Sequence, residues 1–447
     1  MLYKDNKSPF YDPWESLAPG KREQEARKIL DEYIEFARKN VAWYRSRLEG
    51  YNKNAQHPMA NVPVMSASDL RDLVPPVSEK LLVPGVKGYT VFQSGGTTGI
   101  PKTTLFSNEE LEKLTHMNAR GFYAVGLTDK DRVANFWAVG SLYMTFIHMN
   151  RMMQQYGCMN FPFSNHTDID FVRGVAELFK INCFSGISSV VLTNMRNLYD
   201  MGAKDLHIDK IYYGGEHFYE ADKEEVKRKF GTTIVKAPGY GTVDTWYIGY
   251  QCAVSEAHEF HVHDDECFLE IVDPDTGEPC EEGRVGLLLA TAIPRRVMPI
   301  IRYRVGDLGR WVAEPCKCGR TTRKFVLLGR GDDVLRIGFD SVDYNYIQDV
   351  CLKSKLGSGT IQLEKLRLEG KDQLIVRVET EADKGSWDQI AQKLATIIVD
   401  NRPTLRKAIS NKSVWPIKVE LMGLNTLPRN PKTGKLIRVI DAIKDKA

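Results

Sequence analysis

The sequence predicts an α/β protein with a large N-terminal domain, which includes a β-rich subdomain, and a small α+β domain at the C-terminus. Its 447 residues exceed the roughly 100–200 of a typical domain, so we expect two or three folding units. Short apolar runs alternate with helical patterns between residues 133 and 213, which is typical of βαβ units. After about residue 250 the pattern changes to short strands joined by turns, and the last hundred or so residues again mix strands with a helix.

Each element is predicted from its own pattern. Residues 21–50 are expected to form an amphipathic helix, because apolar side chains recur at three- and four-residue spacing. A proline-containing, turn-rich stretch follows, and then come the alternating runs over 133–139, 142–156, 181–185, 189–199 and 211–213. The β-rich subdomain is expected to contain strands over 267–273, 285–291, 308–312 and 324–328. The last unit is expected to contain strands over 360–368 and 373–379, a helix over 386–400 and a strand over 417–422. With a hinge at Asp332, the predicted domains are residues 1–331 and 332–447.

The composition is that of a globular protein, with 43% hydrophobic and 27% charged residues, which excludes a disordered or collagenous chain. A net charge of +3 argues against a protein built mainly to coat nucleic acid or an anionic membrane. The first residues lack the pattern of a signal peptide, and no apolar stretch reaches the roughly 20 residues of a membrane span. Eight cysteines in so long a chain indicate reduced thiols, so we expect a cytoplasmic protein.

A glycine-rich segment, SGGTTGIPK, lies between a β-like run and a helical pattern. Its glycines allow a tight turn that aims backbone N–H groups inward, and its hydroxyls and lysine add donors, so it suits phosphate. It does not match the P-loop pattern GxxxxGK[ST], because Ile100 and Pro101 stand before the lysine. The alternative is a surface turn rich in small residues. The residues expected to bind phosphates are Ser94, Gly95, Gly96, Thr97, Thr98, Gly99 and Lys102.

This segment resembles the phosphate loop of the adenylate-forming (ANL) enzymes, [ST]-[SG]-G-[ST]-T-G-x-P-K. Further elements resemble those of the family and occur in its order: YGGE at 213–216, YGTVD at 240–244, YRVGD at 303–307, GRGDD at 329–333 and PRNPKTGK at 428–435. Within the superfamily the chain looks most like phenylacetate-CoA ligases, because of its compact length and the segments VAWYR at 41–45, PIIRYRVGD at 299–307 and CKCGR at 316–320.

The resemblance implies an activity. Such enzymes use ATP to turn a carboxylic acid into an acyl-adenylate, release pyrophosphate and pass the acyl group on, most often to CoA. Three other acceptors remain open: a carrier-protein thiol, an amine and a protein cysteine. A separate alternative is that the chain is a non-catalytic nucleotide-binding protein on the same scaffold. The resemblance also leaves a homodimer open, and it implies that the C-terminal domain moves.

The resemblance also implies roles for single residues. Lys435 would be catalytic and bridge the carboxylate and the α-phosphate, as a compact cation on a flexible stem can do. Asp307 would hold the ribose, and Arg330 would support it. The remaining nucleotide-binding residues would be Gly215, Glu216, Tyr240, Gly241 and Thr242. For several of these residues an ordinary turn or surface role remains open.

Two departures from the family pattern stand out. Val243 and Asp244 replace the usual Thr-Glu pair, so a hydroxyl is missing and the carboxylate expected to bind Mg²⁺ is one methylene shorter. Thr242 or a water would have to compensate. The acyl-pocket region, 133–165, is rich in aromatic and methionine side chains, which indicates either core packing or an aromatic acid.

A cysteine and histidine pattern predicts a metal site. Cys252, His261, Cys316 and Cys318 would form a closed, structural zinc site of the Cys₃His type, with His258 as a competing ligand. The resemblance supports it, since some relatives of phenylacetate-CoA ligases carry such a site. The alternative is a set of reduced, metal-free cysteines.

Overall fold

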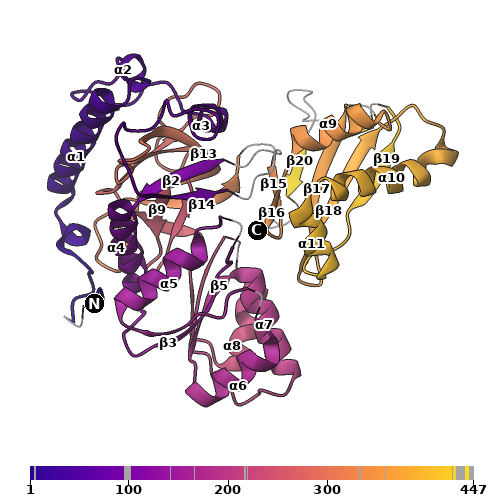
Figure 1. Cartoon of the computed structure of the whole chain (residues 1–447), viewed down its shortest axis with the longest axis horizontal. Helices are drawn as coiled ribbons and strands as arrows, with labels where there is room; N and C mark the ends of the chain where they lie inside the picture. The colour runs from indigo at the N-terminus through magenta and orange to yellow at the C-terminus, as the bar shows by residue number, and fades with distance from the viewer. Residues whose placement is uncertain are drawn as a thin grey trace. The chain divides into compact units, whose positions relative to one another are not determined.

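The computed structural model describes the whole chain except residues 5–6, 95–101, 141, 166, 216–217, 219, 332–333, 358, 425, 429–437 and 442–447, and the side chains of residues 189, 221, 330 and 345. The chain divides into two compact units (Figure 1), the first formed by Met1–Ser94 and Lys102–Gly329, the second containing the chain from Arg330 onward. Both mix helices and strands, which confirms the predicted α/β class. Among the described residues, no helix combines the length and the apolar character that crossing a bilayer would need.

A parallel five-stranded sheet with the order β4-β3-β5-β6-β7 forms one part of the first unit. Helices α6, α7 and α8 lie side by side, with α7 on β5 and β6, whereas α5 packs on β3, β4 and α4 (Figure 1). This arrangement confirms the predicted βαβ alternation. The strand predicted over 133–139 is β3, which ends at Phe136. It ends there because the Trp137 N–H donates to the Asn135 side chain instead of to a neighbouring strand. The bounds are β3 Arg132–Phe136, α5 Thr145–Tyr156, β4 Met159–Phe161, α6 Ile169–Phe179, β5 Cys183–Ile187, α7 Ser188–Asp200, β6 Lys210–Gly214, α8 Glu220–Phe230 and β7 Ile234–Lys236.

A seven-stranded sheet, β11-β12-β13-β14-β10-β9-β8, forms the β-rich part of the same unit. Its apolar face packs with the parallel sheet and its helices in one continuous core. The strand predicted over 308–312 proves to be the end of a longer one, β13, which begins at Ile300. The bounds are β8 Tyr240–Thr242, β9 Trp246–Tyr250, β10 Glu259–Val262, β11 Cys267–Val272, β12 Gly286–Ala292, β13 Ile300–Val312 and β14 Lys324–Arg330.

The N-terminal elements cover this sheet through a second core, in which α1 packs against the chain around the start of β13. The helix predicted over 21–50 is two helices, α1 and the short α2, separated by a break after Asn40. A hairpin, β1 and β2, then leads into α4, which begins with a capping box formed by Ser107 and Glu110. The bounds are η1 Pro13–Ser16, α1 Pro19–Asn40, α2 Tyr44–Arg47, α3 Ala67–Leu73, β1 Tyr89–Gln93, β2 Thr103–Ser107 and α4 Asn108–Ala124.

The second unit has its own core, formed by a four-stranded sheet with the order β19-β18-β17-β20 and the helices that pack on it. Strands β17 and β18 form an antiparallel hairpin, and β19 and β20 add to it in parallel. The bounds are β15 Val334–Ile337, β16 Asp340–Asp343, α9 Tyr344–Ser354, β17 Ile361–Leu368, β18 Lys371–Glu379, η2 Lys384–Ser386, α10 Trp387–Asp400, α11 Pro403–Ser410, β19 Lys418–Met422 and β20 Val439–Asp441.

Candidate active site and metal centre

The phosphate-loop segment is carried by the β1–β2 hairpin. The two ends of the loop are tied together, because the Ser94 N–H donates to the Lys102 carbonyl at 3.0 Å and the Lys102 N–H donates to Ser94 Oγ at 3.2 Å. The sequence predicts a helix directly after this segment, but a strand, β2, lies between the loop and that helix, α4. The other loop residues predicted to bind phosphate, Gly95, Gly96, Thr97, Thr98 and Gly99, lie outside the described residues.

Lys102 and Asp244 form a partly buried ion pair at the base of this hairpin. The Asp244 side chain is 0% exposed, whereas that of Lys102 is 22% exposed. The Lys102 ammonium also donates to the Tyr303 hydroxyl at 2.7 Å, and that hydroxyl donates to Asp244 Oδ2 at 3.1 Å. Burial lowers the pKa of Lys102, but the Asp244 carboxylate and Tyr303 outweigh this effect, so the pKa is raised and the ammonium stays charged. Among the described residues, Asp244 Oδ1 has no hydrogen-bond partner.

A second carboxylate, that of Asp307 on β13, accepts a hydrogen bond from a side chain of β8. The Tyr240 hydroxyl donates to Asp307 Oδ2 at 2.7 Å. Gly241 follows Tyr240, and a Cβ atom there would lie 1.9 Å from the Trp246 carbonyl oxygen, so only glycine fits this hairpin. The Thr242 hydroxyl is bound within the same turn, because it accepts from the Thr245 N–H at 3.1 Å. In this structure the Thr242 side chain stabilises the turn, and its contact with the nucleotide stays a prediction.

The other predicted site residues are placed only in part. Gly215 follows β6 with a φ of 77°, a conformation that favours glycine. Arg330 ends β14, but its side chain is not among the described ones. Glu216, Asp332 and Lys435 lie outside the described residues.

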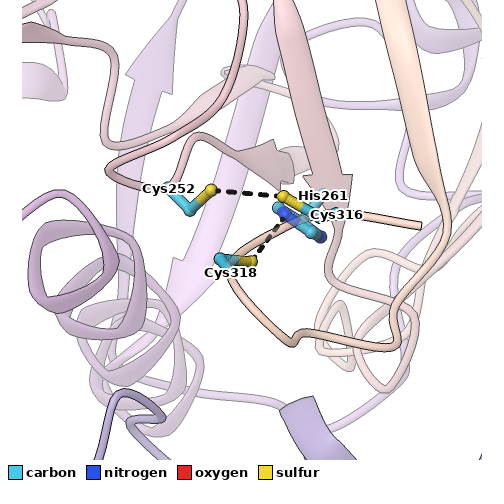
Figure 2. Close-up of side chains that lie close together, drawn as sticks. All are labelled: Cys252, His261, Cys316 and Cys318. Carbon is cyan, nitrogen blue, oxygen red and sulfur yellow. Dashed lines mark hydrogen bonds between the residues drawn. The ribbon is translucent and has the colours of Figure 1, made fainter. Parts of the chain in front are cut away.

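The four cysteine and histidine side chains come together. The ligand atoms of Cys252, His261, Cys316 and Cys318 all lie within 4.8 Å of one another, and His258 is not among them. In Figure 2 the Cys252 and Cys316 sulfurs face each other, 3.7 Å apart, and the Cys318 sulfur faces His261 Nε2 at 3.5 Å. Cys252 follows β9, His261 lies on β10, and the other two cysteines lie in the turn between β13 and β14.

Local contacts orient the imidazole of this group and shift the pKa of one of its thiols. His261 Nδ1 lies 3.0 Å from the Thr322 hydroxyl, which leaves Nε2 facing the sulfurs. Hydrogen bonding from Cys252 lowers the pKa of Cys318 to about 7, although burial opposes it. Three sulfurs and one imidazole nitrogen are the donor set of a tetrahedral structural zinc site.

The turn that carries two of these cysteines also holds the N-terminal arm, which we define as residues 8–17. The Arg320 N–H donates to Cys318 Sγ at 3.4 Å, and its guanidinium donates to Glu15 Oε1 at 2.5 Å. The Thr321 N–H donates to the Glu15 carbonyl at 2.9 Å. The sequence alone predicts no role for Glu15, Arg320 or Tyr303, although Arg320 lies in the motif CKCGR and Tyr303 in YRVGD.

No family model matches the sequence. Curated phenylacetate-CoA ligases do match it. The one from Thermus thermophilus is 26% identical over 431 residues, covering 93% of this chain and 95% of that protein. The one from Pseudomonas putida is 24% identical and covers 98% of both. Among solved structures, a 2-hydroxyisobutyryl-CoA ligase in complex with 2-HIB-AMP and CoA has a TM-score of 0.80 at 20% identity, covering 99% of this chain and 96% of that chain.

The chain therefore shares its fold with this ligase. Its sequence is similar to phenylacetate-CoA ligases along nearly its whole length, which confirms the resemblance inferred from the motifs. Within this ligase fold, much of the aromatic and methionine-rich stretch over 133–165 belongs to the interior. Phe136 and Met153 are 0% exposed, and Phe136 packs on Phe163 and Phe184. For these side chains, core packing explains the composition.

Proposed function

We propose that this chain uses ATP to convert a carboxylic acid to an acyl-adenylate, with release of pyrophosphate, and then passes the acyl group to CoA as a thioester. The observation that carries the proposal is the length of the similarity. The match to the Thermus thermophilus phenylacetate-CoA ligase covers 93% of this chain and 95% of that enzyme, so the similarity extends over nearly the whole length of both.

The described side chains suit this chemistry. The acid's own carboxylate attacks the α-phosphorus, so the protein needs to position charges rather than supply a nucleophile. Asp307 would accept the ribose hydroxyls, and the buried Asp244 would bind Mg²⁺. Lys102 forms an ion pair with Asp244 in this structure, and its side chain is partly exposed. In the proposed reaction this side chain would turn to the phosphates. When bound, Mg²⁺ would neutralise charge on the ATP phosphates.

The remaining roles follow from the resemblance. Lys435 would bridge the attacking carboxylate and the α-phosphate, and Arg330 would support the ribose. The C-terminal domain would move about Asp332 between the two half-reactions. Gly215, Glu216, Tyr240, Gly241 and Thr242 would border the nucleotide.

An aromatic acid is the first substrate to test, because the relatives are named phenylacetate-CoA ligases. A short hydroxy acid is the second, because the solved structure with the same fold is a 2-hydroxyisobutyryl-CoA ligase. The acceptor is proposed as CoA for the same reason, with a carrier-protein thiol or an amine as alternatives.

The test is acid-dependent release of pyrophosphate from ATP and Mg²⁺ over a panel that contains phenylacetate, benzoates and 2-hydroxyisobutyrate. Lys435→Ala should suppress the release strongly, whereas Lys393→Ala, an exposed lysine of α10, should not. Full activity of the Lys435 variant would refute its assigned role. Varying CoA against amines at a fixed acid then identifies the acceptor.

We also propose that Cys252, His261, Cys316 and Cys318 hold a structural Zn²⁺. The geometry supports a closed site, because the protein supplies all four donors and leaves no position for a substrate. Such an ion would fix β10 to the turn after β13 and, through Arg320, would hold the N-terminal arm. None of the eight cysteines forms a disulfide in this structure, which suits a reducing compartment such as the cytoplasm. Purified protein with well under one zinc per chain would remove this proposal.

A further inference from the structure

Two tyrosine–aspartate hydrogen bonds link β13 with the β8 hairpin in opposite directions. Tyr240, on β8, donates to Asp307 on β13 at 2.7 Å. Tyr303, on β13, donates to Asp244, just after β8, at 3.1 Å. Each of the two carboxylates that the proposed function assigns to the nucleotide is therefore held by a tyrosine of the opposite segment.

The two oxygens of Asp244 have different surroundings. Oδ2 receives both the Lys102 ammonium and the Tyr303 hydroxyl. Oδ1 is buried and has no hydrogen-bond partner among the described residues. A buried carboxylate oxygen without a donor is costly, and it is the oxygen that can take a cation as a ligand.

The two donors on Oδ2 differ in how firmly they are fixed. The Lys102 side chain is 22% exposed, and a lysine carries its charge on a stem with four rotatable bonds. Tyr303 is 1% exposed and lies in β13, where a backbone bridge joins it to Met65. Were Lys102 to turn to the phosphates, as the proposed function has it, Tyr303 would be the donor that keeps the Asp244 carboxylate in place.

We propose that Tyr303 is a positioning residue that holds Asp244 Oδ2 and so leaves Oδ1 as the oxygen that would bind Mg²⁺ when MgATP is present. This inference rests on the proposed function. It also accounts for a sequence departure: an aspartate reaches one methylene less far than the usual glutamate, so its orientation has to be fixed by a neighbour. Tyr303 acts through Asp244 and touches no reacting atom.

The experiment compares ATP binding by calorimetry with Mg²⁺ and with EDTA in wild type and Tyr303→Phe. Loss of a hydrogen bond to a charged group predicts a weakening of MgATP binding by roughly tenfold or more. Affinity for metal-free ATP should stay within about twofold, because in this proposal Tyr303 acts on the nucleotide only through Asp244 and its metal. In turnover assays, the Mg²⁺ concentration for half-maximal pyrophosphate release should rise in the variant.

Two further variants separate the interpretations. Tyr240→Phe loosens the ribose carboxylate and should weaken ATP binding equally with and without Mg²⁺. Tyr156→Phe removes a buried hydroxyl that donates to the Leu127 carbonyl at 2.7 Å, outside the site, and should change neither affinity. Circular dichroism checks the fold of each variant.

Asp244→Asn keeps the test decisive if Tyr303→Phe does not fold. It should abolish the gain in affinity that Mg²⁺ gives, and in its background Tyr303→Phe should have no further effect. Wild-type binding of MgATP by Tyr303→Phe, or a full Mg²⁺ gain in Asp244→Asn, would overturn the inference. A wild-type protein that binds no ATP and releases no pyrophosphate would instead overturn the proposed function.

Discussion

Glu15 offers the sharpest test of how the N-terminal arm is held. Its side chain is 0% exposed and that of its partner, Arg320, is 3% exposed, so both charges are out of water. Oε1 accepts from Arg320 at 2.5 Å and from the Tyr250 hydroxyl at 3.0 Å. Oε2 accepts from the backbone N–H groups of Tyr11 and Asp12, at 2.5 and 3.2 Å. One carboxylate thus satisfies four donors.

Glu15→Gln keeps the shape of the side chain but removes its charge and one acceptor. The Arg320 charge stays buried without its counter-ion, and one pair of donors faces an amide NH₂. Breaking a buried pair from one side costs about 3–5 kcal/mol, so we expect a loss of that order in the free energy of unfolding of the first unit. Guanidinium unfolding followed by tryptophan fluorescence measures it. Chymotrypsin should cleave the arm faster, after Phe10, Tyr11 or Trp14.

Glu23→Gln is the matched control. Glu23 forms an ion pair with Arg27 on α1 at 3.7 Å, and its side chain is 70% exposed. Exposed pairs of this spacing contribute about 0.3–0.5 kcal/mol, so the variant should unfold almost like wild type. If Glu15→Gln lost less than about 1 kcal/mol and its arm resisted chymotrypsin as in wild type, the reasoning about this buried pair would be wrong.

Three further predictions concern chemistry, metal and pH. Lys435→Ala should slow pyrophosphate release by about 100-fold or more, because a charge on the reacting phosphoryl group would go unneutralised. Cys318→Ser should lower the zinc content below one per chain and speed up cleavage of the N-terminal arm. Burial raises the pKa of Glu270 to about 7, although Arg302 opposes it. The native state then binds the extra proton, so wild-type stability should fall by up to about 3 kcal/mol relative to Glu270→Gln as pH rises from 4.5 to above 7.

Each of these has an outcome that counts against it. A Lys435 variant with undiminished release would remove that lysine from the chemistry. Zinc measured by mass spectrometry at one per chain in Cys318→Ser would exclude that sulfur as a ligand. Parallel stability curves for wild type and Glu270→Gln, from urea unfolding at several pH values, would show that Glu270 titrates normally.

The fold could be predicted where the local pattern decides the structure. The alternation of short apolar runs with helical patterns predicted the βαβ region, and the structure contains a parallel sheet there. The first helix was predicted too long because Leu30, Ala37, Val41 and Tyr44 all face the same core, at 0–2% exposure. That apolar spacing continues across the break after α1, so a periodic pattern cannot distinguish one helix from two.

The beginning of β13 was missed for a different reason. Arg302 looks like a surface residue in the sequence, yet it is buried against Glu270, 32 residues away along the chain. The site shows the same limit. Tyr303 meets Asp244 across 59 residues and Arg320 meets Glu15 across 305, so only the folded chain reveals these contacts. The grouping of the four cysteine and histidine side chains could be predicted because their side-chain chemistry is distinctive, whereas their role as zinc ligands stays a prediction.

Adenylation of an acid is the central claim, and one assay tests it most directly. The protein is incubated with ATP, Mg²⁺ and CoA over the acid panel, and pyrophosphate and acyl-CoA are measured together, the latter by mass spectrometry. We expect one acid or a small group of acids to give pyrophosphate and thioester in equal amounts, with neither product in the absence of acid. Tight ATP binding with no acid-dependent pyrophosphate for any member of the panel would contradict the account.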